Sequence, residues 1–300
     1  MGYTEIQIKG KNKYYYRTKS IRQGKKVKKL RKYLGKNLND NILKKLEEKI
    51  DIELEKPLSK LLSKEELKFL DRIKDNYKKN GKKDFQLKYE SFISKFTYDS
   101  NAIEGSTLTL RETSSVLFDN ISPEGKSPRE INEAINHKKA FDFMIDYKGD
   151  IDKKFICTLQ KIIITNTLKK ELEDQTGIYR NCQVYIRGAS FIPPKYFEVK
   201  KEMSNLIRWY NRNKNKLHPI IISAYFHSVF ESIHPFVDGN GRTGRLLINF
   251  ILHKNNFPMI NISLKQRLDY YNSLEKARKG DLKDLIKLIM NLMSTPENII

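Results

Sequence analysis

The chain has 300 residues, of which 39% are hydrophobic and 11% aromatic, enough to bury the core of one large domain or of a domain with a small appendage. Its 9 prolines and 14 glycines are too few for a fibrous or disordered protein, and no run of about 18 apolar residues could cross a membrane. The first residues also lack the basic and apolar blocks of a signal peptide, so the sequence predicts a cytoplasmic protein with no membrane partner.

The net charge of +22 arises from 58 Lys and Arg against 36 Asp and Glu. A field of this sign attracts nucleic acids, nucleotides and acidic protein surfaces. A lysine-rich surface with no specific partner explains the same charge. The abundance of Lys, Ile and Asn along the whole chain slightly favours this second interpretation.

Residues 1–36 predict a basic β-hairpin appendage. Residues 3–18 alternate polar and β-prone types, residues 23–26 have the composition of a turn, and residues 29–34 return as a second strand. Basic residues interleaved with tyrosines could follow a nucleic-acid backbone and stack on its bases. Lysines that protect an exposed edge strand are the simpler interpretation, so nucleic-acid binding is not favoured. The hairpin could instead recruit a target protein or a second subunit.

Helical periodicity dominates from residue 37 onward. Helices are expected near residues 39–55, 58–79, 85–104, 127–147, 151–168, 196–213, 218–233, 242–254, 264–278 and 281–293, and another is expected to begin at Thr109. The sequence therefore predicts a mainly helical, all-α fold, with a helical region over residues 37–120 and a core domain over residues 121–295.

Two of these helices have clear start signals. Thr109 and Glu112 have the spacing of a capping box. Ser127 and Glu130 repeat that spacing, with Pro128 at the first helical position. Both signals predict a helix that begins at a defined residue.

One stretch interrupts the helices. Residues 183–192 carry the β-prone side chains Val184, Ile186 and Phe191 around a central glycine, and two prolines follow directly. This pattern predicts a short β-hairpin inside the helical protein.

The segment from His234 to Arg245 holds the parts of an anion-binding site. The glycines around Asn240 let successive backbone N–H groups turn inward as a nest, and the positive end of the next helix points at the same place. Arg242 and Arg245 lie three residues apart in the first turn, so they share a face on which two guanidinium groups could hold phosphates.

Two further side chains in this segment suit phosphate chemistry. A carboxylate beside phosphates is unfavourable unless it binds a divalent cation, so Asp238 implies Mg²⁺. His234 ends the preceding helix, and with a pKa near neutrality it could take a proton from an attacking hydroxyl. Each part is common by itself, but their coincidence within twelve residues favours phosphoryl-group chemistry.

The twelve residues read His-Pro-Phe-Val-Asp-Gly-Asn-Gly-Arg-Thr-Gly-Arg and resemble the signature of the Fic domain family, H-P-F-x-[DE]-G-N-G-R-x-x-R, without a mismatch. The resemblance extends over roughly residues 90–295. It implies a Fic-type helical core with a β-hairpin flap, and a nucleotidyltransferase that uses ATP as substrate and Mg²⁺ or Mn²⁺ as cofactor.

The resemblance also implies roles for single residues. His234 would be the catalytic base, and Asp238 would hold the metal. The flap that clamps the target protein would contain Ile186, Arg187, Gly188, Ala189 and Ser190. The nucleotide would contact Asp238, Gly239, Asn240, Gly241, Arg242, Thr243, Gly244, Arg245 and Tyr271.

A second motif, Ser100-Asn-Ala-Ile-Glu104-Gly105, resembles the inhibitory helix of the family, [ST]-x-x-x-E-[GN], and implies such a helix over about residues 85–105. Ser100 and Glu104 lie one turn apart on one face, and Gly105 would end the helix. A carboxylate held against Arg245 would occupy the place of the γ-phosphate and block productive ATP binding.

The resemblance therefore implies an autoinhibited protein adenylyltransferase, which moves AMP from ATP to a Ser, Thr or Tyr hydroxyl of a target protein or of itself. Gly241 stands where the phosphorylating branch of the family usually has lysine, which favours AMP transfer. Removal of AMP from a modified protein, transfer from another nucleotide such as UTP and, less favoured, a nucleic-acid-binding regulator stay open. Inhibition within one chain or across a homodimer also stays open.

Overall fold

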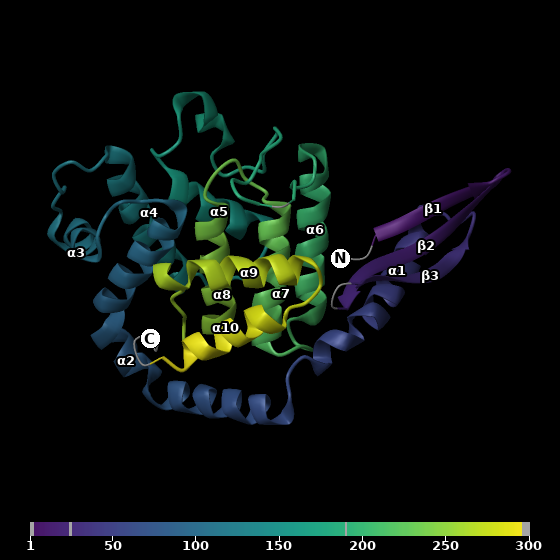
Figure 1. Ribbon diagram of the computed structural model, residues 1–300, viewed down its shortest axis with the longest axis horizontal. Helices are drawn as coiled ribbons and strands as arrows, with labels where there is room; N and C mark the ends of the chain where they lie inside the picture. The colour runs from purple at the N-terminus through teal and green to yellow at the C-terminus, as the bar shows by residue number, and fades with distance from the viewer. Residues whose placement is uncertain (1–2, 24–25, 190, 296–300) are drawn as a thin grey trace.

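The computed structural model describes residues 3–23, 26–189 and 191–295. A helical body stands beside a three-stranded sheet that packs on helix α1 (Figure 1). None of the helices in the described ranges is long and apolar enough to cross a bilayer. The prediction of a mainly helical fold is confirmed by the helices α1 (Asp40–Glu55), α2 (Lys64–Glu104), α3 (Leu110–Ser114), α4 (Pro128–Asp146), α5 (Lys153–Ile164), α6 (Tyr196–Asn213), α7 (Pro219–Ile233), α8 (Asn240–Lys254), α9 (Arg267–Arg278) and α10 (Lys283–Met293).

The N-terminal sheet is antiparallel, with the strand order β1 (Tyr3–Lys9), β2 (Asn12–Gln23) and β3 (Lys26–Lys36). The predicted two-stranded hairpin is wrong, because a turn at Gly10 splits residues 3–18 into two strands. Gly10 has a φ of +60°, a left-handed value that glycine adopts without steric cost. The predicted turn at residues 23–26 joins β2 to β3, and its central residues 24–25 lie outside the described part of the chain.

Helix α2 is one helix of 41 residues, where the sequence predicts two helices over residues 58–79 and 85–104. It begins with a capping box between Ser63 and Glu66, which the prediction missed, and it ends at Gly105 in a left-handed conformation. A single glycine inside a helix costs only about 1 kcal/mol, and the apolar residues that α2 buries in its second half offset this cost. The merged helix therefore carries the inhibitory motif on a rigid support.

Both predicted capping boxes are confirmed. Thr109 caps α3, which continues into the π-helical turn Ser115–Asp119, and Ser127 caps α4 with Pro128 at its start. In each box the hydroxyl accepts a hydrogen bond from the backbone N–H three residues on, and the glutamate at that position accepts one from the backbone of the cap. The first turn of α4 is thereby set at a defined residue, and this turn borders the site described below.

Helices α7 and α8 lie at the centre of the body, and α4, α5, α6, α9 and α10 pack around them (Figure 1). From Asn240 to Leu252, every residue of α8 except Gly241 is buried, as is typical of a core helix. One hydrophobic core extends from α2 to α10, and the boundary between residues 37–120 and 121–295 stays a prediction. Residues 234–239 join the two central helices at one end of this core.

Residues 183–192 form a loop rather than the predicted β-hairpin. The chain reverses where the glycine predicted it, since the Ala189 N–H donates to Ile186 O at 3.1 Å, but no strand pairing occurs among residues 183–189 and 191–192. Side chains tie the base of the loop instead: Arg180 donates to Cys182 O and Pro194 O, and Gln183 Nε2 donates to Pro193 O at 3.2 Å. Gln183 Nε2 also donates to Val184 O at 3.2 Å, and this carbonyl does lie within the predicted hairpin.

Candidate active site

His234 ends α7 in a left-handed conformation, with φ of +49° and ψ of +63°. The His234 N–H donates to Phe230 O at 2.9 Å, and Arg180 Nε donates to His234 O at 2.9 Å, so the neighbours hold this uncommon conformation. Burial lowers the pKa of the imidazole to about 4, although the Glu104 carboxylate favours the protonated form. The predicted pKa near neutrality is therefore wrong, and His234 is neutral at pH 7 and able to accept a proton.

The loop between the two central helices is shaped by Gly239 and Asn240. Gly239 has a φ of +79°, and a Cβ there would lie 2.8 Å from Ile164 Cγ2, so only glycine fits. Asn240 is buried, and its side chain accepts from the Phe236 N–H and donates to Phe236 O, both at 2.9 Å. Thr243 is also fully buried. The side chain of Asn240 thus holds the loop and helix together, and a nucleotide would meet the backbone of this turn.

A ring of four charges surrounds the loop. Arg242 lies 3.3 Å from both Asp238 Oδ1 and Glu133 Oε1. Arg129 closes the ring, with Nε 3.0 Å from Glu133 Oε1 and Nη2 3.1 Å from Asp238 Oδ2. We call Arg129, Glu133, Asp238 and Arg242 the charge ring. The sequence analysis missed Arg129 and Glu133; their i,i+4 spacing indicates a pair on α4 but not its position beside the loop.

Arg245 meets the predicted inhibitory motif within the same chain. Its Nη2 donates to Glu104 Oε1 at 2.8 Å and to Ser100 O at 2.7 Å, and its Nε donates to Ser100 Oγ at 3.0 Å. The Arg245 side chain is only 2% exposed, whereas that of Glu104 is 38% exposed. A buried guanidinium is thus matched by a carboxylate that reaches it from the solvent side.

Glu104 also covers the start of α8. A Cβ on Gly241 would lie 2.1 Å from Glu104 Oε1 and 3.0 Å from Arg245 Nη1. The carboxylate therefore rests almost on the glycine backbone at the positive end of the helix, where an anion is most stable. Any phosphate bound at this helix end must displace Glu104.

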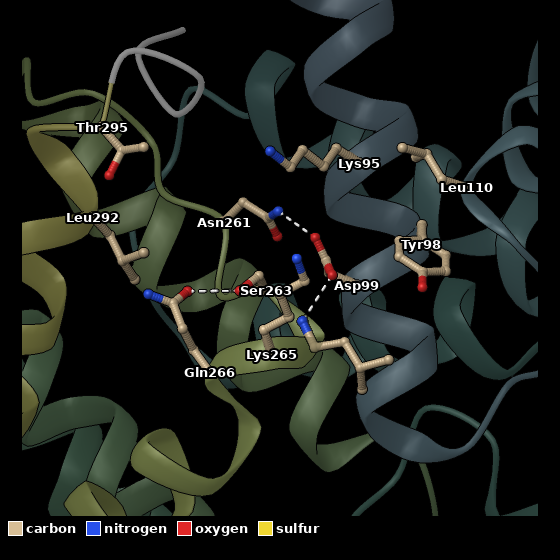
Figure 2. A pocket seen from close by; sticks show the side chains of 11 residues that line it. Lys95, Tyr98, Asp99, Leu110, Asn261, Ser263, Lys265, Gln266, Leu292 and Thr295 are labelled. Atoms are coloured by element: carbon tan, nitrogen blue, oxygen red, sulfur yellow. Dashed lines mark hydrogen bonds between the residues drawn. The ribbon is translucent and has the colours of Figure 1, made fainter.

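The C-terminal part of α2 is anchored on the body (Figure 2). Asp99 accepts hydrogen bonds from Asn261 Nδ2 at 2.6 Å and from the Leu264 N–H at 2.8 Å. The anchor forms part of the wall of a pocket of about 590 Å³, which Lys95 and Tyr98 also line and which contains none of the predicted site residues. This pocket is separate from the chemistry, but its wall fixes the helix turn that presents Glu104.

A buried carboxyl lies behind the loop, and the sequence analysis missed it. Glu231 Oε2 is 3.9 Å from His234 Nδ1, and burial, reinforced by Glu104, raises the pKa of Glu231 to about 8. A Cβ on Gly244 would lie 2.5 Å from Glu231 Oε1 and 2.8 Å from the His227 ring, so Gly244 leaves the space that these two side chains fill. The spacing of Glu231 and His234 at i,i+3 was the available signal.

Tyr271 borders the site from α9, where the charges of Glu104 and Arg245 act on its hydroxyl, and the loop over residues 183–189 and 191–192 contacts the same helix. Tyr271 is 40% exposed, with the Arg267 guanidinium 5.5 Å from its ring centroid. The ring of Phe191 lies 4.2 Å from the guanidinium of Arg278, which joins this loop to α9. The predicted target-binding residues Ile186, Arg187, Gly188 and Ala189 form the turn of the loop, and Ser190 lies outside the described residues.

The residues present fit a divalent cation held mainly by its substrate. No group of three or more His, Cys, Asp or Glu in the described ranges could hold a metal by itself. Asp238 offers one partly exposed carboxylate on the loop, and Mg²⁺ commonly uses one or two carboxylates together with substrate phosphates. Arg129 now lies against that carboxylate, and because its side chain is 54% exposed it can leave at little cost.

The chain is similar to several known proteins. Residues 150–252 match the model of the Fic/DOC family. The chain is 36% identical over 196 residues to the protein adenylyltransferase Fic of Drosophila melanogaster, covering 64% of this chain and 39% of that protein. It is 35% identical over 195 residues to the protein of the same name from Nematostella vectensis, covering 64% of this chain and 45% of that protein. The chain therefore spans less than half the length of these curated relatives.

Two solved structures share the fold. A Fic domain containing signaling protein from Bacteroides thetaiotaomicron superposes with a TM-score of 0.68 at 25% identity, covering 75% of this chain and 92% of that one. Fic-1 (aa134–508) from C. elegans superposes with a TM-score of 0.67 at 25% identity, covering 86% of this chain and 76% of that one. Each superposition covers more of this chain than the matched family domain, residues 150–252. The structural similarity therefore includes helices that precede residue 150.

Proposed function

We propose that this chain, which carries a Fic/DOC family domain over residues 150–252, is a protein adenylyltransferase that moves AMP from ATP to a Ser, Thr or Tyr hydroxyl, and that Glu104 holds it inactive. The observation that carries the proposal is the contact between Glu104 at the end of α2 and Arg245 in α8, beside the loop that holds His234 and Asp238. The target is another protein or the chain itself. The contact lies within one chain, so inhibition needs no homodimer.

The reaction follows from where the groups lie. The phosphates of ATP bind at the start of α8, on its free N–H groups and on Arg242 and Arg245. His234 removes the proton of the target hydroxyl as its oxygen attacks the α-phosphorus. The new P–O bond forms as the bond to the β-phosphate oxygen breaks, and pyrophosphate leaves with its charge held by the arginines. His234 keeps the proton until it returns to solvent.

Asp238 is the residue that would hold Mg²⁺ or Mn²⁺. When bound, the cation would neutralise phosphate charge that the arginines alone do not cover. Asp238 can serve this role once Arg129 leaves its Oδ2, and Arg242 then keeps the carboxylate oriented through Oδ1. Glu133 holds Arg242 from the other side, which leaves this arginine in place when Asp238 changes partner.

Inhibition follows from charge and space. The carboxylate of Glu104 sits on the guanidinium and the helix end that the phosphates need. ATP must therefore displace it or bind in an unproductive geometry. Because Glu104 is partly exposed and lies at the last residue of α2, a single side-chain movement would release it.

The proposal is tested with Glu104→Gly. We expect this variant to incorporate AMP into itself or into a protein target, while the wild type incorporates little. Intact-protein and peptide mass spectrometry, after incubation with a mixture of ATP and UTP, reports the donor, the transferred group and the modified residue together. Glu90→Gly, at an exposed position of the same helix, is the matched control for a weakened α2 and should behave as wild type.

Incorporation by neither the wild type nor Glu104→Gly contradicts the proposal. Release of AMP from a modified protein by the wild type, with no incorporation by Glu104→Gly, would instead assign the site to the reverse reaction. Glu104 approaches His234 closely enough to favour its protonated form, so a water held between these two residues is the geometry that such a reaction would use.

A further inference from the structure

The positive charge of the chain is concentrated at its N-terminus. Residues 1–36 contain 13 Lys and Arg and one acidic residue, Glu5. The remaining 264 residues contain 45 Lys and Arg against 35 Asp and Glu, so this short segment supplies more than half of the net charge of +22. A compositional bias toward lysine along the whole chain does not explain such a distribution, because elsewhere acidic residues largely balance the basic ones.

The sheet formed by this segment has one covered face and one free face. Tyr15 and Leu34 are buried on the covered face, toward α1. Thr4 donates a hydrogen bond to Glu47 of α1, and Arg17 Nη1 lies 3.7 Å from the same carboxylate. Because side chains alternate along a strand, Tyr14 and Tyr16 point to the opposite face.

That opposite face carries a cluster that we call the tyrosine face: Tyr14, Tyr16, Arg31, Tyr33 and Lys36. The ring centroids of Tyr16 and Tyr33 lie 5.2 Å apart, and those of Tyr14 and Tyr33 lie 6.5 Å apart. The Arg31 guanidinium lies 3.8 Å from the Tyr16 centroid, and Lys36 Nζ lies 5.9 Å from the Tyr14 centroid. Tyr33 is 54% exposed. Aromatic rings and cations are therefore interleaved on one surface.

Protection of sheet edges explains only part of this surface. In a two-stranded hairpin both strands are edges, and lysines on them would prevent pairing with other chains. In the three-stranded sheet β2 is the central strand, so Tyr14 and Tyr16 lie away from both edges. The partly exposed rings of Tyr14 and Tyr16 on the central strand add nothing to edge protection, and the Tyr33 ring beside them exposes apolar area that a purely protective surface would avoid.

We propose that the tyrosine face binds single-stranded nucleic acid, with its two cations on phosphates and its rings stacked on unpaired bases. The combination matches what such binding requires: a positive surface that attracts the backbone, and aromatic faces that accept any base. The Arg31 guanidinium already stacks over the Tyr16 ring, and this adds a cation–π contact to the tyrosine face. This binding is independent of the adenylyltransferase proposal and uses other residues.

The test uses the full chain and a fluorescent single strand of about 16 nucleotides, DNA in one arm and RNA in the other. Fluorescence anisotropy follows binding between roughly 50 and 200 mM salt. We expect the wild type to bind with a steep salt dependence, and Arg31→Gln with Lys36→Gln to reduce the slope by about 0.7 for each cation. Lys170→Gln with Lys201→Gln removes the same charge from exposed positions of the helical body and should leave affinity and slope nearly unchanged.

The rings are tested separately from the charges. Tyr16→Leu with Tyr33→Leu should weaken binding at least about fivefold at an unchanged salt slope. Tyr16→Phe with Tyr33→Phe keeps the rings and should keep the affinity, which separates stacking from a damaged sheet.

Four outcomes overturn the proposal: no binding by the wild type at low salt, equal loss in the helical-body control, full affinity in the leucine variant, or equally tight binding of a duplex or of polyglutamate. The last would assign the surface to double-stranded nucleic acid or to an acidic protein.

Discussion

The candidate active site and the tyrosine face are both rich in cations, but they hold them in opposite ways. Arg242 and Arg245 are each 2% exposed, and each is paired with a carboxylate. Arg31 and Lys36 lie exposed on the sheet, and the Glu5 carboxylate, 3.2 Å from Arg31, is itself partly exposed. The same residue types therefore occur in a buried, charge-matched setting and in a solvated one.

This difference in burial determines what an anion must displace in order to bind to each region. Burying a guanidinium without a partner costs several kcal/mol, and at Arg242 and Arg245 the helical body offsets this cost with carboxylates. In the proposed site a phosphate would have to replace the carboxylate on Arg245, so its binding would depend on Glu104. On the sheet, water already solvates the cations, and the one internal partner, Glu5 beside Arg31, is itself partly exposed and leaves at little cost. The arginines of the candidate active site are therefore closed off by buried pairing, and the cations of the sheet are open to solvent.

The largest effect is expected from a substitution that removes the proposed catalytic base and leaves the charged residues of the site in place. In a Glu104→Gly background, His234→Ala should lower AMP transfer by about 10²- to 10⁴-fold, because the substitution removes the side chain that takes the hydroxyl proton in the proposed reaction. ATP binding, measured by calorimetry, should persist, and so should oligonucleotide binding by the tyrosine face. A transfer rate within a few-fold of the parent would exclude His234 as the base.

A smaller effect is expected on the free energy of unfolding, which should differ between the buried and the exposed ion pairs when each loses its carboxylate. Glu104→Gln should destabilise the protein by about 1–2 kcal/mol, because it leaves the buried Arg245 without a matching charge; the partial exposure of Glu104 keeps this below the cost of breaking a fully buried pair. Glu5→Gln, in the exposed pair with Arg31, should cost less than about 0.5 kcal/mol. Urea denaturation of both variants measures the difference, and equal losses would contradict it.

A methyl group at the start of α8 should disrupt the contact between Glu104 and Arg245 without removing either charged residue. A Cβ on Gly241 would overlap Glu104 Oε1, so Gly241→Ala should displace the carboxylate and raise self-labelling up to about tenfold, as a loss of about 1.4 kcal/mol from the contact allows. In the Glu104→Gly background the same substitution should bring no further gain. A gain there would show that Gly241 acts on something other than Glu104.

The smallest effect concerns the pH dependence of stability. Because the pKa of Glu231 is raised to about 8 in the folded protein, the fold holds a proton that the unfolded chain releases near its ordinary pKa of 4.5, and the stability contributed by the protonated carboxyl falls as pH rises between these values. Arg245, which favours the ionised form, limits the fall, while Glu104 increases it, and the adjacent imidazoles of His227 and His234 are neutral.

Glu231→Gln removes this titration. Relative to wild type, the variant should gain less than about 1.4 kcal/mol of stability between pH 6 and pH 7, the limit for one proton over one pH unit. Urea denaturation at the two pH values checks it. His234 titrates below this window and contributes little to the difference. A constant difference between the two proteins would mean that Glu231 is ionised throughout.

Local signals predicted much of the site. The capping boxes at Thr109 and Ser127 act over three residues, and both are present as predicted. The loop from His234 to Arg245 was equally predictable, because a glycine with a left-handed φ, a helix start and two arginines in one turn are all set within a few residues. Even so, the local pattern failed at residues 183–192, where contacts of the Arg180 and Gln183 side chains with the flanking carbonyls of Cys182 and Pro193 hold the base of a loop.

Contacts between distant segments depended on packing. Ser100 and Glu104 share a helix face by spacing alone, but their meeting with Arg245, across 141 residues, follows from the way α2 packs beside α8. Arg129 reaches Asp238 across 109 residues because α4 begins next to the loop. The sequence by itself determined the helical fold, the chemical groups of the loop and the charge of the first strands. Only the tertiary structure decided which charges are buried together, because burial, and with it the need for a partner, is a property of the assembled core.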